Sequence, residues 1–250
     1  MEVRLIDYTG HGHSDPARHA ANVLLFTKQT RLNMTAGLME DIASWPEDKV
    51  NEELAYMANT IPSSWEFVEY KFLINGVTRG FTHQFVRTRT GSYAQQTMRV
   101  LDVSGWGYGT GPTIETDEDR KQRYDDAMHT IAEAYDELVA DGAAIEDARG
   151  ILPTNILTNI VAKFDLRTIS DTARKRASTR TQGEYRLVMD AMKSEIIRVH
   201  PWADMFLNRT FDKAAAELES RITAICNGHR IPDTMRINLI KLIDQMRATA

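Results

Sequence analysis

The chain has 250 residues, enough for one large domain or two small ones that bury a core without disulfides or metals. Its 30 basic and 35 acidic residues give a net charge of −5, which argues against a protein that coats duplex nucleic acid, although a local basic pocket is compatible with it. With 42% hydrophobic and 26% charged residues, the composition is that of a globular protein.

The cysteine content and the N-terminus indicate where the protein works. Cys226 is the single cysteine and cannot form an internal disulfide, which favours a reducing compartment. The N-terminus has no apolar segment flanked by basic residues, so no signal peptide is predicted. No stretch approaches the roughly 20 apolar residues that cross a bilayer. We therefore expect a cytoplasmic protein without a membrane role.

The spacing of apolar residues predicts mostly helices and two strands. The strands are expected over 3–8 and 68–74, the second closed by Asn75-Gly76. The run over 104–112 carries four alternate glycines and is expected to be a mobile loop. Thr116 with Asp119 resembles a capping box. Helices are expected over 17–43, 52–59, 77–88, 116–140, 153–178, 182–199, 213–227 and 231–247.

This order of elements, without a repeat or a linker, predicts a single domain over 1–250 of the α+β class, mainly helical.

Polar and basic residues are densest over 84–99, QFVRTRTGSYAQQTMR. Gln84 and Arg87 are three apart and share a helix face, and Arg89 lies where the chain approaches Gly91. Guanidinium groups bind phosphate bidentately, and a carboxamide such as Gln84 or Gln95 presents a donor and an acceptor to a pyrimidine edge. The segment therefore suits a nucleotide, while a solvated helix face whose arginines pair with acids is the alternative.

A second set of arginines runs over 149–186. Within it, Arg167, Asp171 and Arg174 share one face of the expected helix. Their spacing alone is equally typical of an internal network of salt bridges.

Three blocks of sequence, in order, resemble the flavin-dependent thymidylate synthase (ThyX) family. The first, WEFVEYKFLINGVTRGFTHQFVR over 65–87, is similar to the family's strand and helix before its signature. The second, Arg87-x-Arg89-x-x-Ser92 followed by Thr97-x-Arg99, is similar to the signature itself. The third comprises 149–155, 165–168, 176–177 and 182–184. The resemblance covers about 64–202 and favours a ligand site over salt bridges alone.

The resemblance implies a ThyX-like fold, with a small sheet flanked by long helices, and a homotetramer whose active sites are built from several chains. It also implies a reaction in which reduced FAD accepts a one-carbon unit from methylenetetrahydrofolate and passes it to C5 of dUMP, with NADPH as the reductant. No cysteine attacks the base in this family. Cys226, outside every matched block, is therefore expected to be a buried small hydrophobe.

The resemblance also implies which residues bind the substrate. The nucleotide positions are Gln84, Arg87, Gln95, Thr97, Arg99, Arg149 and Arg176. Arg99 and Arg149 are expected at the phosphate. Arg176 is expected at the pyrimidine, where a fixed positive charge stabilises anionic character as C5 becomes nucleophilic. Arg176 and Thr97, which keeps the hydroxyl of the family's serine, are the expected catalytic residues.

The flavin positions contain most of the departures from the family. These positions are Thr88, Arg89, Asp165, Arg167, Asp171 and Arg180. Thr88 and Arg180 replace histidines, Asp165 and Asp171 replace asparagines, and Phe67 replaces a further histidine. Gln95 replaces an acid and supplies an amide that can flip, which leaves the choice between uracil and cytosine open.

Three functions from different classes remain. The first is C5 transfer to dUMP, or to UMP or dCMP with a methyl or hydroxymethyl product. The second is a nucleotide-binding protein that has lost FAD. The third, a single-stranded nucleic-acid binder that stacks bases on Tyr93, Trp106 and Tyr108, is disfavoured by the charge of −5. We expect no metal, because His11 and His13 have no third ligand nearby in the sequence.

Overall fold

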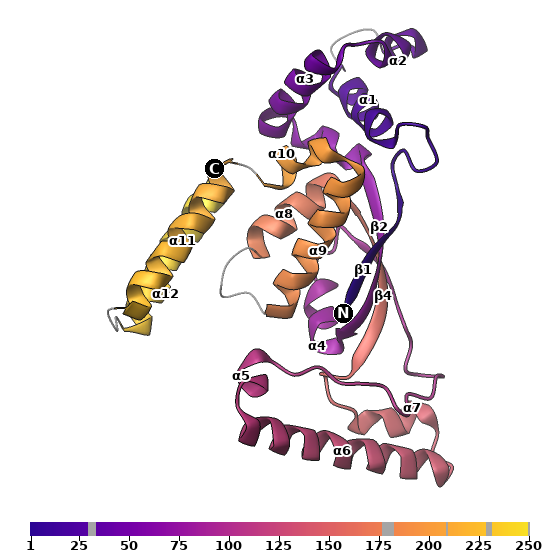
Figure 1. Cartoon of the computed structure of the whole chain (residues 1–250). Helices are drawn as coiled ribbons and strands as arrows, with labels where there is room; N and C mark the ends of the chain where they lie inside the picture. The colour runs from indigo at the N-terminus through magenta and orange to yellow at the C-terminus, as the bar shows by residue number, and fades with distance from the viewer. Residues whose placement is uncertain (30–33, 177–182, 209, 229–231, 250) are drawn as a thin grey trace. The chain divides into compact units, whose positions relative to one another are not determined.

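The computed structural model describes residues 1–29, 34–176, 183–208, 210–228 and 232–249 (Figure 1). The chain forms two compact units: unit 1 consists of Met1–Arg4 and Leu73–Ala162, and unit 2 of Leu5–Phe72 and Lys163–Ala250. One four-stranded sheet has the order β1-β2-β4-β3. The strands are β1 (Glu2–Tyr8), β2 (Glu69–Thr78), β3 (Ser92–Gln95) and β4 (Leu157–Asp165). The chain passes between the units within β1, β2 and β4.

Helices make up most of unit 2 and more than half of the described residues as a whole, so the expected class, mainly helical α+β with a small sheet, is confirmed. The helices of unit 1 are α4 (Arg79–Phe85), α5 (Pro112–Glu115), α6 (Glu118–Ala140), α7 (Ile145–Ala148) and the 3-10 helix η2 (Arg149–Ile151). The helices of unit 2 are α1 (Pro16–Lys28), α2 (Ala36–Ala43), α3 (Glu47–Thr60), η1 (Pro62–Phe67), α8 (Leu166–Arg176), α9 (Gly183–Val199), η3 (Pro201–Ala203), α10 (Asp204–Leu207), α11 (Thr210–Gly228) and α12 (Asp233–Thr249).

Strand β4 is the main difference from the sequence-based prediction. The predicted helix over 153–178 is wrong, because Leu157–Asp165 is a strand and helix α8 begins only at Leu166. Alternate residues of β4, such as Ile160 and Phe164, are buried, while the others are half-buried. Since apolar residues occur on both faces, the period of two is masked in the sequence.

Three further boundaries differ from the prediction. The predicted helix over 17–43 is two helices, because no apolar residue supports a buried face over 27–31 and Thr35 has an extended backbone. Asn75-Gly76 does not end β2; Gly76 has a φ of +65° and donates its N–H to Asn159 Oδ1 at 2.9 Å. Helix α6 is capped by the Asp117 side chain, not by Thr116.

Unit 1 has a small core between α6 and the glycine-rich segment. Its buried members are Met98, Val103, Tyr135, Ala148 and Ile156. The glycine-rich segment is not helix or strand, as predicted, but it is held in place rather than free. Gly109 N–H donates to Asn155 O, and Leu157 N–H donates to Gly107 O, both at 2.9 Å. Residues 155–157, at the entry to β4, therefore hold this segment.

Unit 2 contains a cluster of aromatic rings that pack against one another. The His200 ring lies 5.3 Å from the ring of Trp202, and Trp202 lies 5.6 Å from Phe206. Phe206 also contacts Trp65 of η1, at 5.0 Å between ring centroids. Further along the chain, α11 and α12 lie side by side (Figure 1), and Cys226 is buried in α11 with 3% exposure, as expected of a small hydrophobe.

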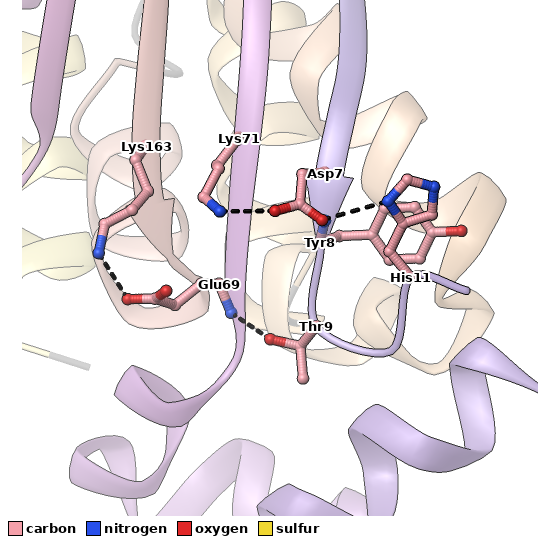
Figure 2. Close-up of polar contacts among 7 residues, drawn as sticks. All are labelled: Asp7, Tyr8, Thr9, His11, Glu69, Lys71 and Lys163. Atoms are coloured by element: carbon pink, nitrogen blue, oxygen red, sulfur yellow. Dashed lines mark hydrogen bonds and ion pairs between the residues drawn. The ribbon is translucent and has the colours of Figure 1, made fainter. Parts of the chain in front are cut away.

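Charged side chains link the three strands within unit 2 (Figure 2). Asp7 of β1 pairs with Lys71 of β2 at 2.5 Å, and Glu69 of β2 pairs with Lys163 of β4 at 2.7 Å. The hydrogen bond from Lys71 lowers the pKa of Asp7. Because these pairs are partly exposed, each stabilises the sheet only modestly.

The packing of Gly109 gives a first prediction. A Cβ on Gly109 would lie 2.6 Å from Thr78 Cγ2, whereas a Cβ on Gly111 would meet nothing within 4 Å. Thr78 cannot rotate away freely, because its hydroxyl oxygen accepts the Phe81 N–H at 3.0 Å. We expect Gly109→Ala to lower the free energy of unfolding by about 1–3 kcal/mol. Urea denaturation measures this, with Gly111→Ala as the control; equal stability of the two variants would contradict it.

The burial of His200 gives a second prediction. Its ring shares a 2.9 Å hydrogen bond with the Tyr70 hydroxyl, and burial lowers its pKa from 6.5 to about 4. Between these two pH values the unfolded chain binds a proton that the folded chain does not. The free energy of unfolding therefore falls as the pH falls from about 6.5 to about 4, by up to about 3 kcal/mol.

Urea denaturation at several pH values measures this loss. His200→Gln cannot titrate, so its stability should fall less over the same window. His19, whose pKa is also lowered by burial, remains in both proteins and does not affect the comparison. Parallel pH profiles for the two proteins would show that His200 is not responsible.

Candidate functional site

The turn between α4 and β3 carries the first group of candidate residues. Tyr93 holds this turn, because its hydroxyl lies 3.1 Å from Phe85 O and 2.7 Å from Thr88 O. The Tyr93 ring also contacts the Phe85 ring, at 5.5 Å between centroids. Arg87 and Arg89 are therefore displayed from a fixed backbone, a supporting role for Tyr93 that the sequence alone does not indicate.

Arg87 and Arg89 are exposed guanidinium groups on this turn. Within the described residues, neither has a carboxylate partner, although 35 acids are present in the chain. Gln84, at the end of α4, is also exposed. The alternative, in which these arginines pair with acids, is thus not seen among the described residues, and both guanidinium groups are available there for an anionic ligand.

Arg99 and Arg149 are brought together by a residue that sequence analysis did not identify, Glu146. Arg99 Nε donates to Glu146 Oε2 at 2.9 Å, and Arg149 Nε donates to the backbone oxygen of Glu146 at 3.1 Å. The two residues that are predicted to bind phosphate therefore lie on either side of one residue. No motif marks Glu146 among the acids of the chain.

Arg79 adds a third cation to this group. Burial lowers the pKa of Arg79, and the positive charge of Arg149 lowers it further. Its Nη1 atom is buried and has no hydrogen-bond partner among the described residues. An unpaired buried donor beside a like charge is costly unless an anion compensates it. Arg79 lies in a block that resembles the family, but its role becomes visible only in the structure.

Gln95 and Thr97, also in unit 1, make hydrogen bonds with residues other than Glu146. Gln95 Nε2 donates to Thr82 Oγ1 at 3.0 Å, so the side chain lies against α4. Thr97 is exposed, and its hydroxyl oxygen accepts the Arg99 N–H at 3.1 Å. Thr97 therefore supports the backbone that carries Arg99.

The flavin positions in unit 2 have partners within the chain. Asp165 Oδ1 accepts the Thr168 N–H at 2.6 Å and so caps α8. Arg167 pairs with Glu66 at 2.6 Å, and Asp171 pairs with Arg174 at 3.2 Å. Of the salt bridges that spacing suggested for this face, the Asp171–Arg174 pair is present, whereas Arg167 pairs with Glu66 of η1.

Two other predicted residues are Arg176, the last residue of α8, and Arg180, which follows it in the sequence. The guanidinium carbon of Arg176 lies 4.7 Å from the centre of the Tyr185 ring, a cation–π contact. Arg180 lies outside the described residues. Arg176 is thus oriented by an aromatic ring of α9 and forms no ion pair with an acid among the described residues.

An apolar cavity of about 400 Å³ lies within unit 2. Its lining comes from α1, η1 and Met34, and consists of Val23, Phe26, Thr27, Met34, Ser63, Ser64 and Phe67. Phe67 is 60% exposed and directly follows Glu66, the partner of Arg167. The cavity has the apolar walls and few hydroxyl groups that suit a flat heteroaromatic ring.

The predicted site residues divide between the two units. Unit 1 holds Gln84, Arg87, Thr88, Arg89, Gln95, Thr97, Arg99 and Arg149. Unit 2 holds Asp165, Arg167, Asp171 and Arg176. In the described ranges, no group of three His, Cys, Asp or Glu residues could hold a metal ion. The helices of those ranges include none with the length and apolar character needed to cross a bilayer.

Comparison with known proteins gives consistent matches. A family model described as "Thymidylate synthase complementing protein" matches residues 4–202. The flavin-dependent thymidylate synthase of Clostridium tetani is 32% identical over 218 residues, which cover 80% of this chain and 84% of that protein. That of Sulfurisphaera tokodaii is 30% identical over 206 residues, which cover 80% of this chain and 75% of that protein.

A solved structure is similar as well. The UMP/dUMP methylase PolB from Streptomyces cacaoi, bound with 5-Br dUMP, gives a TM-score of 0.63 at 18% identity, over 81% of this chain and 92% of that chain. The two chains share a fold.

The group formed by Arg79, Arg99 and Arg149 gives a third prediction, with inorganic phosphate as the probe. At ten times its dissociation constant, phosphate should raise the melting temperature by roughly 3–6 °C, as a ligand of the folded state does. Arg149→Gln should lose most of this rise. Arg123→Gln is the matched control, because Arg123 Nε also donates to a helix carbonyl, Asp119 O at 3.0 Å. An undiminished rise in Arg149→Gln would refute the anion site.

Proposed function

The chain belongs to the flavin-dependent thymidylate synthase family, and we propose that it transfers a one-carbon unit from methylenetetrahydrofolate to C5 of a pyrimidine nucleoside monophosphate. The default reaction converts dUMP to dTMP, with NADPH as the reductant. The observation that carries the proposal is the family match over residues 4–202, which spans every candidate site residue.

The reaction balances around C5 of the base. A bond from C5 to the transferred carbon forms, and the C5–H bond breaks with release of its proton to water. The bonds from that carbon to the two folate nitrogens break, and tetrahydrofolate leaves. The hydride of NADPH supplies the two electrons that reduce the methylene group to methyl. A bound flavin would supply the carrier for the one-carbon unit and for these electrons.

The cations of unit 1 are proposed to bind the nucleotide. Arg79, Arg99 and Arg149 would hold the phosphate, because guanidinium forks match phosphate oxygens. Binding there would compensate the buried, unpaired Nη1 of Arg79 and compete with the carboxylate of Glu146 for Arg99. Gln84 and Arg87, exposed at the end of α4, would extend the site toward the sugar and base.

Arg176 is proposed to act on the base. Its guanidinium group, held against the Tyr185 ring, would stabilise negative charge that develops on the pyrimidine as C5 becomes nucleophilic. Thr97 would assist by holding the backbone of Arg99 through the 3.1 Å contact. The role of Arg176 follows its family position, whereas the supporting role of Thr97 follows from its contact with Arg99.

The residues present fit a flavin ring in part. The apolar cavity of about 400 Å³ beside Phe67 would take a flat ring, with the hydroxyls of Thr27 and Ser63 as hydrogen-bonding groups on its wall. Arg167 would have to exchange Glu66 for the cofactor, and Asp171 would have to exchange Arg174. Arg89, which has no such partner among the described residues, would bind FAD without an exchange. Asp165, engaged as the cap of α8, would support the fold of this region rather than touch FAD.

Assembly and location complete the proposal. Family membership supports a homotetramer in the cytoplasm, in which the two units of each chain act as one domain. UMP is the second candidate substrate, because the structurally similar PolB is described as a UMP/dUMP methylase.

The visible spectrum of the purified protein and the release of tritium from C5-labelled nucleotides test this function. A flavin spectrum, with release from dUMP that depends on methylenetetrahydrofolate and NADPH, would support it. Parallel assays with labelled UMP and dCMP identify the substrate. A colourless protein that does not bind added FAD and releases no tritium would refute the proposal.

Two variants give a fourth prediction about the mechanism. Arg176→Ala should abolish tritium release from dUMP, because the charge that stabilises the activated base is removed. Cys226→Ala should retain nearly full release, since Cys226 is buried in α11, beyond the residues that match the family. Loss of activity in the cysteine variant, with an unchanged melting temperature, would contradict a mechanism without a thiol.

A further inference from the structure

The side chain of Gln95 is anchored at one end by two buried threonines. Its Nε2 atom lies 3.0 Å from Thr82 Oγ1 and 3.5 Å from Thr158 Oγ1. Thr82 is fully buried and Thr158 is 2% exposed, so water does not compete for either hydroxyl. The shorter contact, to Thr82 of α4, is the stronger constraint on the amide.

The hydroxyl of Thr82 decides which end of the amide faces it. A threonine hydroxyl has a single proton. Thr82 Oγ1 donates that proton to Arg79 O at 3.0 Å, one turn earlier in α4. Toward Gln95, Thr82 can therefore only accept a hydrogen bond. An amide oxygen placed there would bring two acceptors together in a buried position, which is costly.

The Oε1 atom of Gln95 is consequently the end that remains for a ligand. Gln95 is half-buried, and its oxygen has no hydrogen-bond partner in the described part of the chain. An isolated amide can flip and present either a donor or an acceptor. In this protein the hydroxyl of Thr82, inside α4, prevents the amide of Gln95 from flipping. Gln95 therefore presents only a hydrogen-bond acceptor, Oε1, to a ligand.

We propose that Thr82 is a positioning residue that makes Gln95 an obligatory hydrogen-bond acceptor, and that Gln95 Oε1 accepts from a donor group of the bound nucleotide. This inference rests on the proposed function. A pyrimidine nucleotide offers two donors of this kind, the ring N3–H of uracil and a sugar hydroxyl. Cytosine has no N–H at N3 and would place an acceptor against Oε1.

Steady-state kinetics with dUMP test the inference in three variants. Thr82→Val keeps the shape of the buried side chain but removes the acceptor, so the amide can flip. We expect KM for dUMP to rise about tenfold while kcat changes less than twofold, the size of effect for one hydrogen bond in a site. Thr82→Ser keeps the hydroxyl and should restore the KM of the wild type.

Gln95→Leu keeps the inference testable even if Thr82→Val folds poorly, because it removes the accepting oxygen and leaves α4 unchanged. KM should rise at least as much as in Thr82→Val. The double variant should show no further rise, since both substitutions remove one interaction. Additive rises in KM would mean that Thr82 acts independently of Gln95 and would overturn the inference.

Substrate analogues identify the donor and separate the two proposals. If N3–H is the donor, Thr82→Val should not weaken binding of N3-methyl-dUMP; if the 3′-hydroxyl is the donor, the same holds for 3′-deoxy-dUMP. An equal loss with dUMP and both analogues would make Thr82 merely structural and would refute the inference. Failure of the wild type to bind or turn over dUMP would instead refute the proposed function.

Discussion

Unit 1 depends on the hydrogen bonds that residues 154–157, which lead into β4, make with two other segments. The backbone oxygens of Thr154 and Ile156 accept the N–H groups of Gly80 and Arg79, at 2.6 and 3.0 Å, and so hold the start of α4. Residues 155 and 157 pair with the glycine-rich segment. Because α4 carries Gln84 and leads into the turn with Arg87, the position of the candidate nucleotide residues follows from these bonds. The close approach requires Gly109, since a side chain there would meet Thr78.

The sequence predicted the class of the fold and the identity of most candidate residues, but not the strand that organises unit 1. Amphipathic helices such as α6 and α9 have one apolar face and one polar face, so their period is visible. Strand β4 is apolar on both faces and reads as a helix. The candidate site residues were predicted from their order and spacing in the chain, which relatives in a family share. Glu146 and Arg79 were given no role, because their importance arises from contacts between distant residues.

The arginines of the chain fall into two groups that their spacing does not distinguish. Arg167 and Arg174 have carboxylate partners and behave as parts of a structural network. Arg87 and Arg89 have none among the described residues, and the donor atom Nη1 of Arg79 is buried without a partner. The net charge of −5 therefore does not reveal that some arginines are paired with acids while others are not. In the proposed anion site the second group needs no exchange of partners, whereas a guanidinium group that is already neutralised, such as that of Arg99 by Glu146, must first give up its carboxylate.

The buried hydroxyl of Thr82 has a consequence for how substrate preference can change during evolution. In the proposed arrangement, selectivity at Gln95 is set by Thr82, a buried residue of α4 that no ligand touches. Mutations on the wall of the site would adjust affinity, but a reversal of the hydrogen-bonding pattern would require a change at this interior position. Laboratory evolution toward a different base should therefore sample the layer beneath the site, and libraries confined to its visible surface would omit the decisive position.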